Sequence, residues 1–130
     1  MIVDSSAIIA IVSNEPDADA LASKLNAAKG ELAISAGNYL ESAVVLDNPR
    51  FAGIALRLNE IIDEMEIEIA PVTAQQAKLG RQFYRQYGKG SGHPAKLNFG
   101  DCFAYALAIE RDEPLLFKGE DFLHTDVRRV

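Results

Sequence analysis

The sequence predicts an α/β protein, a three-layer α/β/α sandwich built around a mainly parallel sheet. Short apolar runs that suit buried strands alternate with longer segments that suit helices, which is the pattern of a parallel sheet with helices on both faces. Glycine and proline fall where these segments begin and end. The chain has 130 residues, enough for one domain with a substantial core, and no repeat or linker divides it. We therefore expect residues 1–130 to form a single domain.

The first half of the chain is predicted to contain two strands and four helices. Proline suits the first turn of a helix and glycine suits its end, and these residues set most of the boundaries. The run from Asn48 to Ile62 combines an N-cap, a proline and an apolar stripe at helical spacing. In order, we expect a strand at 2–3, helices at 7–12 and 16–29, a strand at 32–34, and helices at 37–46 and 48–62.

The second half is predicted to add two helices, two further strands and a candidate edge strand. Thr73 and Gln76 have the spacing of a capping box, so a helix is expected to begin there. The glycine-rich segment 88–94 predicts a flexible loop after that helix. We expect a strand at 67–72, a helix at 73–87, a second helix from Asn98 to Arg111, a strand at 114–117 and a candidate edge strand at 127–130.

Composition limits the kind of protein that this chain can be. Apolar residues make up 48% and charged residues 25%, as in soluble globular proteins. No apolar run approaches the roughly 20 residues that span a bilayer, and the N-terminus lacks a basic signal-like region, so no membrane association is expected. The single cysteine, Cys102, excludes an internal disulfide framework and favours a cytoplasmic location, and we expect it to be a small buried side chain.

The charge is unevenly distributed along the chain. The formal net charge is −6, which by itself argues against a nucleic-acid partner. However, residues 69–100 contain no Asp or Glu and carry a formal charge of +5, so the rest of the chain carries −11. A chain polarised in this way can present one basic face to a polyanion. The cations of this stretch are Lys78, Arg81, Arg85, Lys89 and Lys96.

Four acidic residues occupy positions that a parallel sheet brings together. Ligands bind at the carboxyl ends of the strands in such sheets. Asp4 follows the first predicted strand, and Asp121 follows the strand at 114–117. Asp101 lies in the first turn of a predicted helix, and Glu41 lies about two turns into another. All four side chains could therefore converge at one end of the sheet.

Four converging carboxylates would repel one another unless a cation were present. Magnesium and manganese prefer hard oxygen ligands of this kind. Two such ions about 3.5–4 Å apart can hold a phosphodiester, activate a water and stabilise the leaving oxygen. The only histidines, His93 and His124, fall in predicted loops without metal-type spacing, so this chemistry would rest on the acids alone.

Each acid also has a purely structural explanation. Asp4 and Asp101 suit helix caps, Glu41 suits a solvated helix face and Asp121 suits a turn. The basic helix face is likewise compatible with a solvated surface. Three other classes of protein are alternatives: a phosphoacceptor domain with an acidic pocket, an Asp-x-Asp phosphatase and a non-catalytic binding module. A phosphoacceptor needs an Asp after a central strand, and none follows residues 67–72; an Asp-x-Asp phosphatase is disfavoured by Ser6.

The amino-acid sequence of several segments resembles that of the PIN-domain ribonucleases, and specifically that of the VapC-like toxins of bacterial toxin–antitoxin pairs. The resemblance covers essentially the whole chain. Its most specific blocks are Asn98-Phe99-Gly100-Asp101-Cys102 and Leu116-Phe117-Lys118-Gly119-Glu120-Asp121-Phe122. The opening segment from Met1 to Ala7, the segment 35–41 and the loop 88–95 also match.

The resemblance implies an activity and a set of site residues. It implies a metal-dependent endoribonuclease that uses Mg²⁺ or Mn²⁺, is usually dimeric, and is silenced by a cognate antitoxin protein. Asp4 and Asp101 would be the direct metal ligands, Glu41 and Asp121 would complete the cluster, and Ser6 would support it. Arg81, Arg85, Lys89 and Lys96 would hold the phosphates of the RNA substrate.

Overall fold

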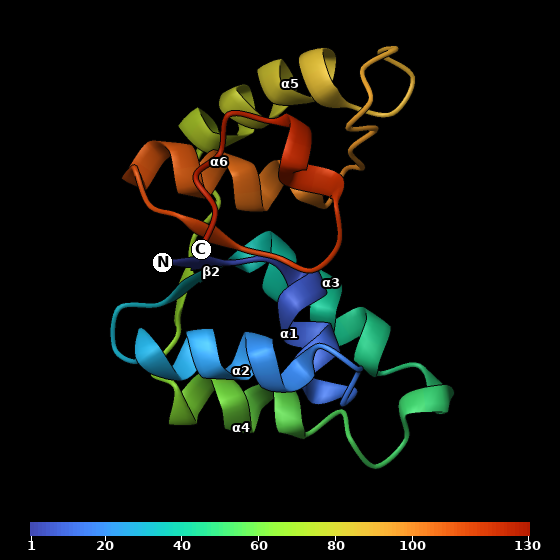
Figure 1. The fold of residues 1–130 in the computed structure, drawn as a ribbon, viewed down its shortest axis with the longest axis vertical. Coiled ribbons are helices and arrows are strands. Elements are labelled where there is room, and N and C mark those ends of the chain that lie inside the picture. Colours follow the sequence, from blue (N-terminus) through green and yellow to red (C-terminus); the bar gives the residue numbers. More distant parts are fainter.

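Four short strands form one parallel sheet in the computed structural model, which describes residues 1–130 (Figure 1). Their spatial order is β3-β2-β1-β4, and every neighbouring pair is parallel. Ile2 pairs with Ala33 on one side and with Leu115 on the other. The strands are β1 (Ile2–Val3), β2 (Ala33–Ser35), β3 (Glu68–Ala70) and β4 (Leu115–Leu116). The predicted α/β fold is confirmed.

Helices cover both faces of this sheet. Figure 1 shows α5 and α6 on one side of the strands and α1, α2 and α4 on the other, so the fold has three layers. The bounds are α1 Ser5–Val12, α2 Ala18–Ala27, α3 Ala36–Leu46, η1 Pro49–Phe51, α4 Arg57–Glu64, α5 Ala74–Tyr87, α6 Asp101–Arg111 and η2 Asp121–His124, where η1 and η2 are 3₁₀ turns. None of the helices is both long and apolar enough to cross a membrane.

The order of the strands places a crevice at the centre of the sheet. The chain runs outward from β1 to β2 and β3, and it then returns past β1 to form β4 on the other side. In parallel sheets, ligands bind where the strand order reverses in this way, beyond the carboxyl ends of the strands. Asp4 and the segment from Lys118 to Asp121 follow β1 and β4 directly, so both lie at this crevice.

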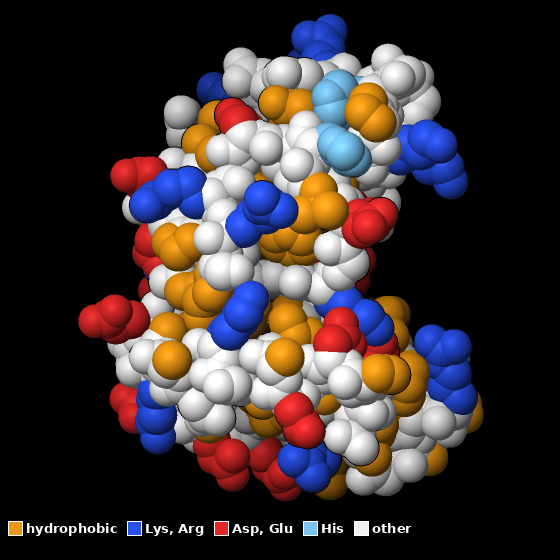
Figure 2. Space-filling view, in the orientation of Figure 1, with side chains coloured by type: hydrophobic (Ala, Val, Ile, Leu, Met, Phe, Trp, Pro, Cys, Tyr) orange, Lys and Arg blue, Asp and Glu red, His pale blue; other side chains and the backbone are white.

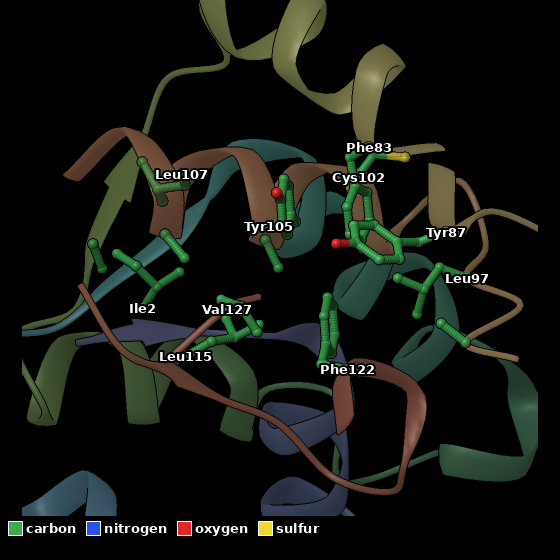
Figure 3. Close-up of a cluster of buried hydrophobic side chains, with 14 of the residues drawn as sticks. Ile2, Phe83, Tyr87, Leu97, Cys102, Tyr105, Leu107, Leu115, Phe122 and Val127 are labelled. Carbon is green, nitrogen blue, oxygen red and sulfur yellow. The ribbon is translucent and has the colours of Figure 1, made fainter. Parts of the chain in front are cut away.

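Two separate hydrophobic cores hold the layers together. Ile2 and Leu115 point into the core beneath α5 and α6, which Figure 3 shows together with the stacked rings of Phe83 and Tyr105. Val3 and Leu116, the next residues along the same strands, point into the opposite core against α1, α2 and α4. Because successive side chains of a strand face opposite sides of a sheet, β1 and β4 are anchored in both cores.

The predicted helix over 48–62 is wrong in its first half. Pro49–Phe51 form only a 3₁₀ turn, and the regular helix α4 begins at Arg57. Asn48 does act as a cap, because its side chain accepts a hydrogen bond from the Arg50 amide at 3.1 Å. The chain cannot continue as a helix because Gly53 adopts a φ of +89°, in the left-handed region that glycine enters readily.

Smaller differences concern helix and strand ends. The helix predicted over 16–29 spans Ala18–Ala27. The side chain of Thr73 caps α5, but the Gln76 side chain bonds Glu110 of α6 instead of completing a capping box. The candidate strand at 127–130 is reduced to one isolated bridge between Leu115 and Arg129. Of these differences, the missing capping box has a visible cause, because the tertiary contact with Glu110 takes the Gln76 side chain away from the helix start.

Candidate active site

Asp4 is both a helix cap and a buried carboxylate. Its amide donates to Leu116 O at 2.9 Å, which continues the β1–β4 pairing to the end of the strand. Its Oδ2 accepts hydrogen bonds from Ser6 N at 2.9 Å and from Ser6 Oγ, so it caps α1. The residue is only 2% exposed, and its Oδ1 is buried without a hydrogen-bond partner. The capping role therefore leaves one carboxylate oxygen free for a ligand.

Ser6 connects the ends of β1 and β4. Its hydroxyl bonds Asp4 Oδ2 and accepts a hydrogen bond from the Lys118 amide at 3.0 Å. The Lys118 side chain, in turn, forms ion pairs with Glu15 and Asp17 in the segment between α1 and α2. These contacts fix the turn that carries Asp121 relative to Asp4.

Asp101 is the first residue of α6 and follows Gly100 at the N-cap position, and the side chain of Asn98 serves the first amide of that helix. Asp101 N donates to Asn98 Oδ1 at 3.1 Å, and Asn98 N donates to Asp101 Oδ2 at 2.7 Å. The sequence predicts a helix from Asn98, but residues 99 and 100 form a turn and α6 begins only at Asp101. Asp101 is buried at the helix N-terminus, where the helix dipole favours a carboxylate.

Glu41 reaches the same region from α3. Its Oε2 accepts hydrogen bonds from Ser5 Oγ at 2.8 Å and from Asn38 Nδ2 at 3.3 Å. Asn38 Nδ2 also donates to Gly100 O, next to Asp101, at 3.0 Å. Glu41 is half-buried, and its carboxylate therefore lies between the first turn of α1 and the start of α6.

The four acids interact electrostatically. Burial raises the pKa of Asp101 to about 7, the Asn98 hydrogen bond opposes this shift, and the charges of Asp4, Asp121 and Glu41 raise the pKa further. Burial also raises the pKa of Asp4 to about 6, against the hydrogen bonds from Ser6 and with a further contribution from Glu41. Asp121 is exposed at the start of η2 and contributes its charge. All four sequence-predicted acids thus lie at the same end of the sheet, close enough for the charges of the other three to act on Asp101.

The side chains present fit a hard divalent cation. Every candidate ligand is a carboxylate or hydroxyl oxygen, and Asp4 Oδ1 is a buried acceptor without a donor. No three His, Cys, Asp or Glu side chains are already arranged closely enough to coordinate one ion directly. Figure 2 shows the molecule hollowed between its upper and lower layers on the side where β1 ends, with acidic side chains at the margin.

The predicted phosphate-binding cations lie on the upper layer. Arg81 and Arg85 are exposed on α5, and neither forms an ion pair. Lys89 and Lys96 line a concave part of the loop after α5, together with Gly90, Gly92 and His93. Figure 2 shows Lys and Arg side chains over α5 and over this loop. These cations have no acidic partner that would compete with a phosphate.

Cys102 packs between α5 and α6 and is buried, as expected. Its thiol donates weakly to Asn98 O at 3.7 Å. Burial, with the neighbouring Asp101 charge, raises the pKa of this thiol to about 11. The thiol therefore stays protonated and is not a nucleophile at neutral pH.

Three residues of the site were missed from the sequence. Ser5 and Asn38 hold Glu41, and Gly100 contacts both Asn38 and the Glu41 carboxylate. Nothing local marks Asn38 as a partner of a residue 62 positions away. The only available signal was its place one helical turn before Glu41, because side chains three residues apart share a helix face.

Comparison with known proteins identifies the family. The PIN domain model matches residues 1–128. The chain belongs to the PIN-domain family. Within this family it belongs to the VapC-like ribonucleases, since it is 55% identical over 130 residues to ribonuclease VapC28 of Mycobacterium tuberculosis, covering 100% of this chain and 97% of that protein.

Solved structures agree on the fold of this PIN domain. The crystal structure of VapC20 of Mycobacterium tuberculosis, described as a sarcin-ricin loop cleaving toxin, superposes with a TM-score of 0.78 at 15% identity, covering 99% and 97% of the two chains. A toxin–antitoxin complex from Klebsiella pneumoniae matches with a TM-score of 0.71 at 18% identity, covering 96% and 92%. The predicted resemblance to VapC-like PIN domains is confirmed.

Proposed function

We propose that this PIN domain is a metal-dependent endoribonuclease that acts as the toxin of a toxin–antitoxin pair. The observation that carries the proposal is the meeting of Asp4, Glu41, Asp101 and Asp121 at the crevice of the sheet, with raised carboxyl pKa values at Asp4 and Asp101. Buried like charges of this kind favour binding of a cation. Names of relatives such as ribonuclease VapC28 support RNA as the substrate.

Asp4 and Asp101 are the proposed direct ligands of Mg²⁺ or Mn²⁺. Each already uses its Oδ2 in hydrogen bonds within the chain, and Asp4 Oδ1 is free of any partner. Glu41 and Asp121 complete the cluster through water, which suits an arrangement without three preformed ligands. When bound, the cation lowers the pKa of a water molecule and neutralises charge on the phosphodiester.

The chain's own residues orient the substrate for hydrolysis. Arg81, Arg85, Lys89 and Lys96 hold backbone phosphates, while the four acids keep the attacking water at the crevice. Water, and not the ribose 2′-hydroxyl, is the proposed nucleophile. We propose that the water attacks phosphorus and that the 3′ oxygen leaves with a proton, so the products would carry a 5′-phosphate and a 3′-hydroxyl.

Two partners are proposed besides RNA. The structural match to a toxin–antitoxin complex from Klebsiella pneumoniae supports an antitoxin as a partner. We propose that this antitoxin covers the acidic crevice and silences the chain. A homodimer is supported by an apolar patch beside Glu41, formed by Leu40, Val44 and Phe99, which are 62%, 65% and 75% exposed. Exposed apolar patches of this kind mark interaction surfaces. Because its proposed substrate is RNA, we propose that the protein acts in the cytoplasm.

Cleavage of RNA with and without divalent cation tests the proposed activity. Wild-type protein should cut RNA with Mg²⁺ or Mn²⁺ and stop in excess chelator, and the cut ends should accept ligation as 5′-phosphates. Asp4→Asn and Asp101→Asn should reduce cleavage to background, whereas Asp63→Asn, an exposed acid on α4, should not. Cleavage that persists in chelator would refute the mechanism, and RNA that is bound but uncut would favour a non-catalytic module.

A further inference from the structure

We infer that Asn38 and Gly100 are positioning residues that fix the Glu41 carboxylate at the acid cluster. This inference rests on the proposed function, because it assigns a task to one member of the proposed metal site. The contact joins α3 to the first turn of α6 across the crevice. It therefore couples the orientation of Glu41 to the position of Asp101.

Asn38 is placed to do this by hydrogen bonding alone. Its side chain is completely buried, and its Nδ2 donates both to Gly100 O at 3.0 Å and to Glu41 Oε2 at 3.3 Å. Its Oδ1 is buried without a partner. The unpaired oxygen costs free energy, but the reverse orientation of the amide would place this oxygen against two other acceptors, Glu41 Oε2 and Gly100 O. These two acceptors therefore set the orientation of the amide.

Position 100 requires a glycine because of the neighbouring Glu41 side chain, and not because of its own backbone conformation. Its φ of −61° and ψ of −37° lie in the right-handed helical region, which any L-residue adopts readily. However, a Cβ atom on Gly100 would lie 2.6 Å from Glu41 Oε2 and closer still to Oε1. The absence of a side chain therefore allows the carboxylate to lie against the backbone that precedes Asp101.

Ser5 completes the set of contacts from the opposite side. Its hydroxyl donates to the same Glu41 Oε2 at 2.8 Å. The Oε2 atom is thus held by donors from α1 and α3, and Oε1 packs beside Gly100. Hydrogen bonds that orient metal ligands typically change metal affinity by 10–100-fold when they are removed.

Binding of Mn²⁺ to the RNA-free protein, measured by calorimetry, tests this inference. Asn38→Ala and Gly100→Ala should each lower the affinity for Mn²⁺ by about 10-fold. Ser42→Ala is the matched control, because Ser42 is also completely buried in α3 and its hydroxyl donates to Asn38 O and forms no hydrogen bond with the Glu41 carboxylate. Ser42→Ala should keep wild-type affinity for Mn²⁺, even if it lowers the melting temperature.

A double-mutant cycle shows whether Gly100 acts through Glu41. In a Glu41→Ala background, Gly100→Ala should have no further effect on Mn²⁺ affinity, because the carboxylate it would displace is gone. If Asn38→Ala does not fold, Gly100→Ala decides, since its backbone accepts alanine. In the metal-free protein, the side-chain amide signal of Asn38 in nuclear magnetic resonance spectra should shift on Glu41→Ala.

The possible outcomes separate this inference from the proposed function. Wild-type affinity in folded Asn38→Ala or Gly100→Ala, or an equal loss in Ser42→Ala, would overturn the positioning role while leaving the metal site intact. A wild-type protein that binds no Mn²⁺ would instead contradict the proposed metal site, and the positioning role with it. If Gly100→Ala lowers the affinity for Mn²⁺ further in the Glu41→Ala background, Gly100 does not act through Glu41.

Discussion

Asn98 and Asp101 exchange two hydrogen bonds at the start of α6, one in each direction. Asn98 N donates to Asp101 Oδ2, and Asp101 N donates to Asn98 Oδ1. The helix is therefore capped by Asn98, and the Asp101 carboxylate is oriented by a backbone amide that no side-chain substitution at position 98 removes. From the sequence alone, Asp101 could be either a helix cap or a metal ligand. In the structure, Asn98 bonds the helix start and the Asp101 carboxylate is left for the ligand role.

Asn98→Ala should consequently affect stability more than catalysis. The substitution removes the side-chain cap, which typically costs about 1 kcal/mol, but it keeps the amide that orients Asp101. Urea unfolding should show a loss of that size, while RNA cleavage should remain near the wild-type rate. Asp101→Asn should show the reverse pattern. Loss of cleavage in a folded Asn98→Ala protein would mean that the cap itself positions the carboxylate.

The stability of the metal-free protein should fall as the pH rises from about 4 to above 7. The pKa values of Asp4 and Asp101 are raised in the folded state to about 6 and about 7, so the folded chain binds these protons more tightly than the unfolded chain. Each pKa unit corresponds to about 1.4 kcal/mol. The melting temperature should therefore be several degrees lower at pH 8 than at pH 5, and Mg²⁺ or Mn²⁺ should restore it at pH 8.

Neutralising one of these acids tests the same prediction without a change in pH. Asp4→Asn keeps a good capping residue for α1 but removes the buried charge, so the metal-free variant should be more stable than wild type at pH 8. The same variant should gain no stability from Mg²⁺. A melting temperature that is lower than that of wild type at pH 8 would show that the carboxylate is stabilised by the fold itself.

The basic residues of α5 should account for part of the salt dependence of RNA binding. Replacing Arg81 or Arg85 by alanine should lower the slope of log affinity against log salt by about 0.7 per lost phosphate contact on a single strand. Arg57→Ala on α4, an exposed arginine of the opposite layer, is the control and should leave the slope unchanged. Binding should be measured with Asp101→Asn so that the RNA stays intact. An unchanged slope for Arg81→Ala would assign this face to solvent.

The apolar patch of Leu40, Val44 and Phe99 should mediate self-association. Light scattering should give twice the chain mass for wild type, and Val44→Glu should give the monomer mass because it places a charge in the patch. Leu56→Glu is the control, because Leu56 is also strongly exposed, at 77%, but lies outside the patch, just before α4. A wild-type monomer, or a dimer that survives Val44→Glu, would leave this patch without the proposed partner.

The sequence was informative where a chemical signal is local. Asp4, Asp101 and Asp121 each follow a strand or open a helix, so their convergence follows from the parallel topology alone. The contact between Asn38 and Gly100 joins distant segments, and neither residue carries a local signal of it. The apolar stripe beyond Asn48 predicted a continuous helix, but the left-handed backbone of Gly53 interrupts it. The contact of Asn38 with Gly100 depends on the tertiary fold, which a single sequence does not reveal, whereas the break at Gly53 is a local backbone choice that glycine permits but does not require.

The two hydrophobic cores on either side of β1 make Asp4 sensitive to defects in both layers. Val3 and Ile2, the two residues before it, are packed in opposite cores. A cavity made under α6, as in Leu107→Ala, or under α4, as in Leu58→Ala, would loosen the same short strand. Temperature-sensitive alleles of this chain could therefore be selected from either layer. In a host cell that carries such an allele, a change of temperature would then turn the toxin on or off while every acid of the site stays unaltered.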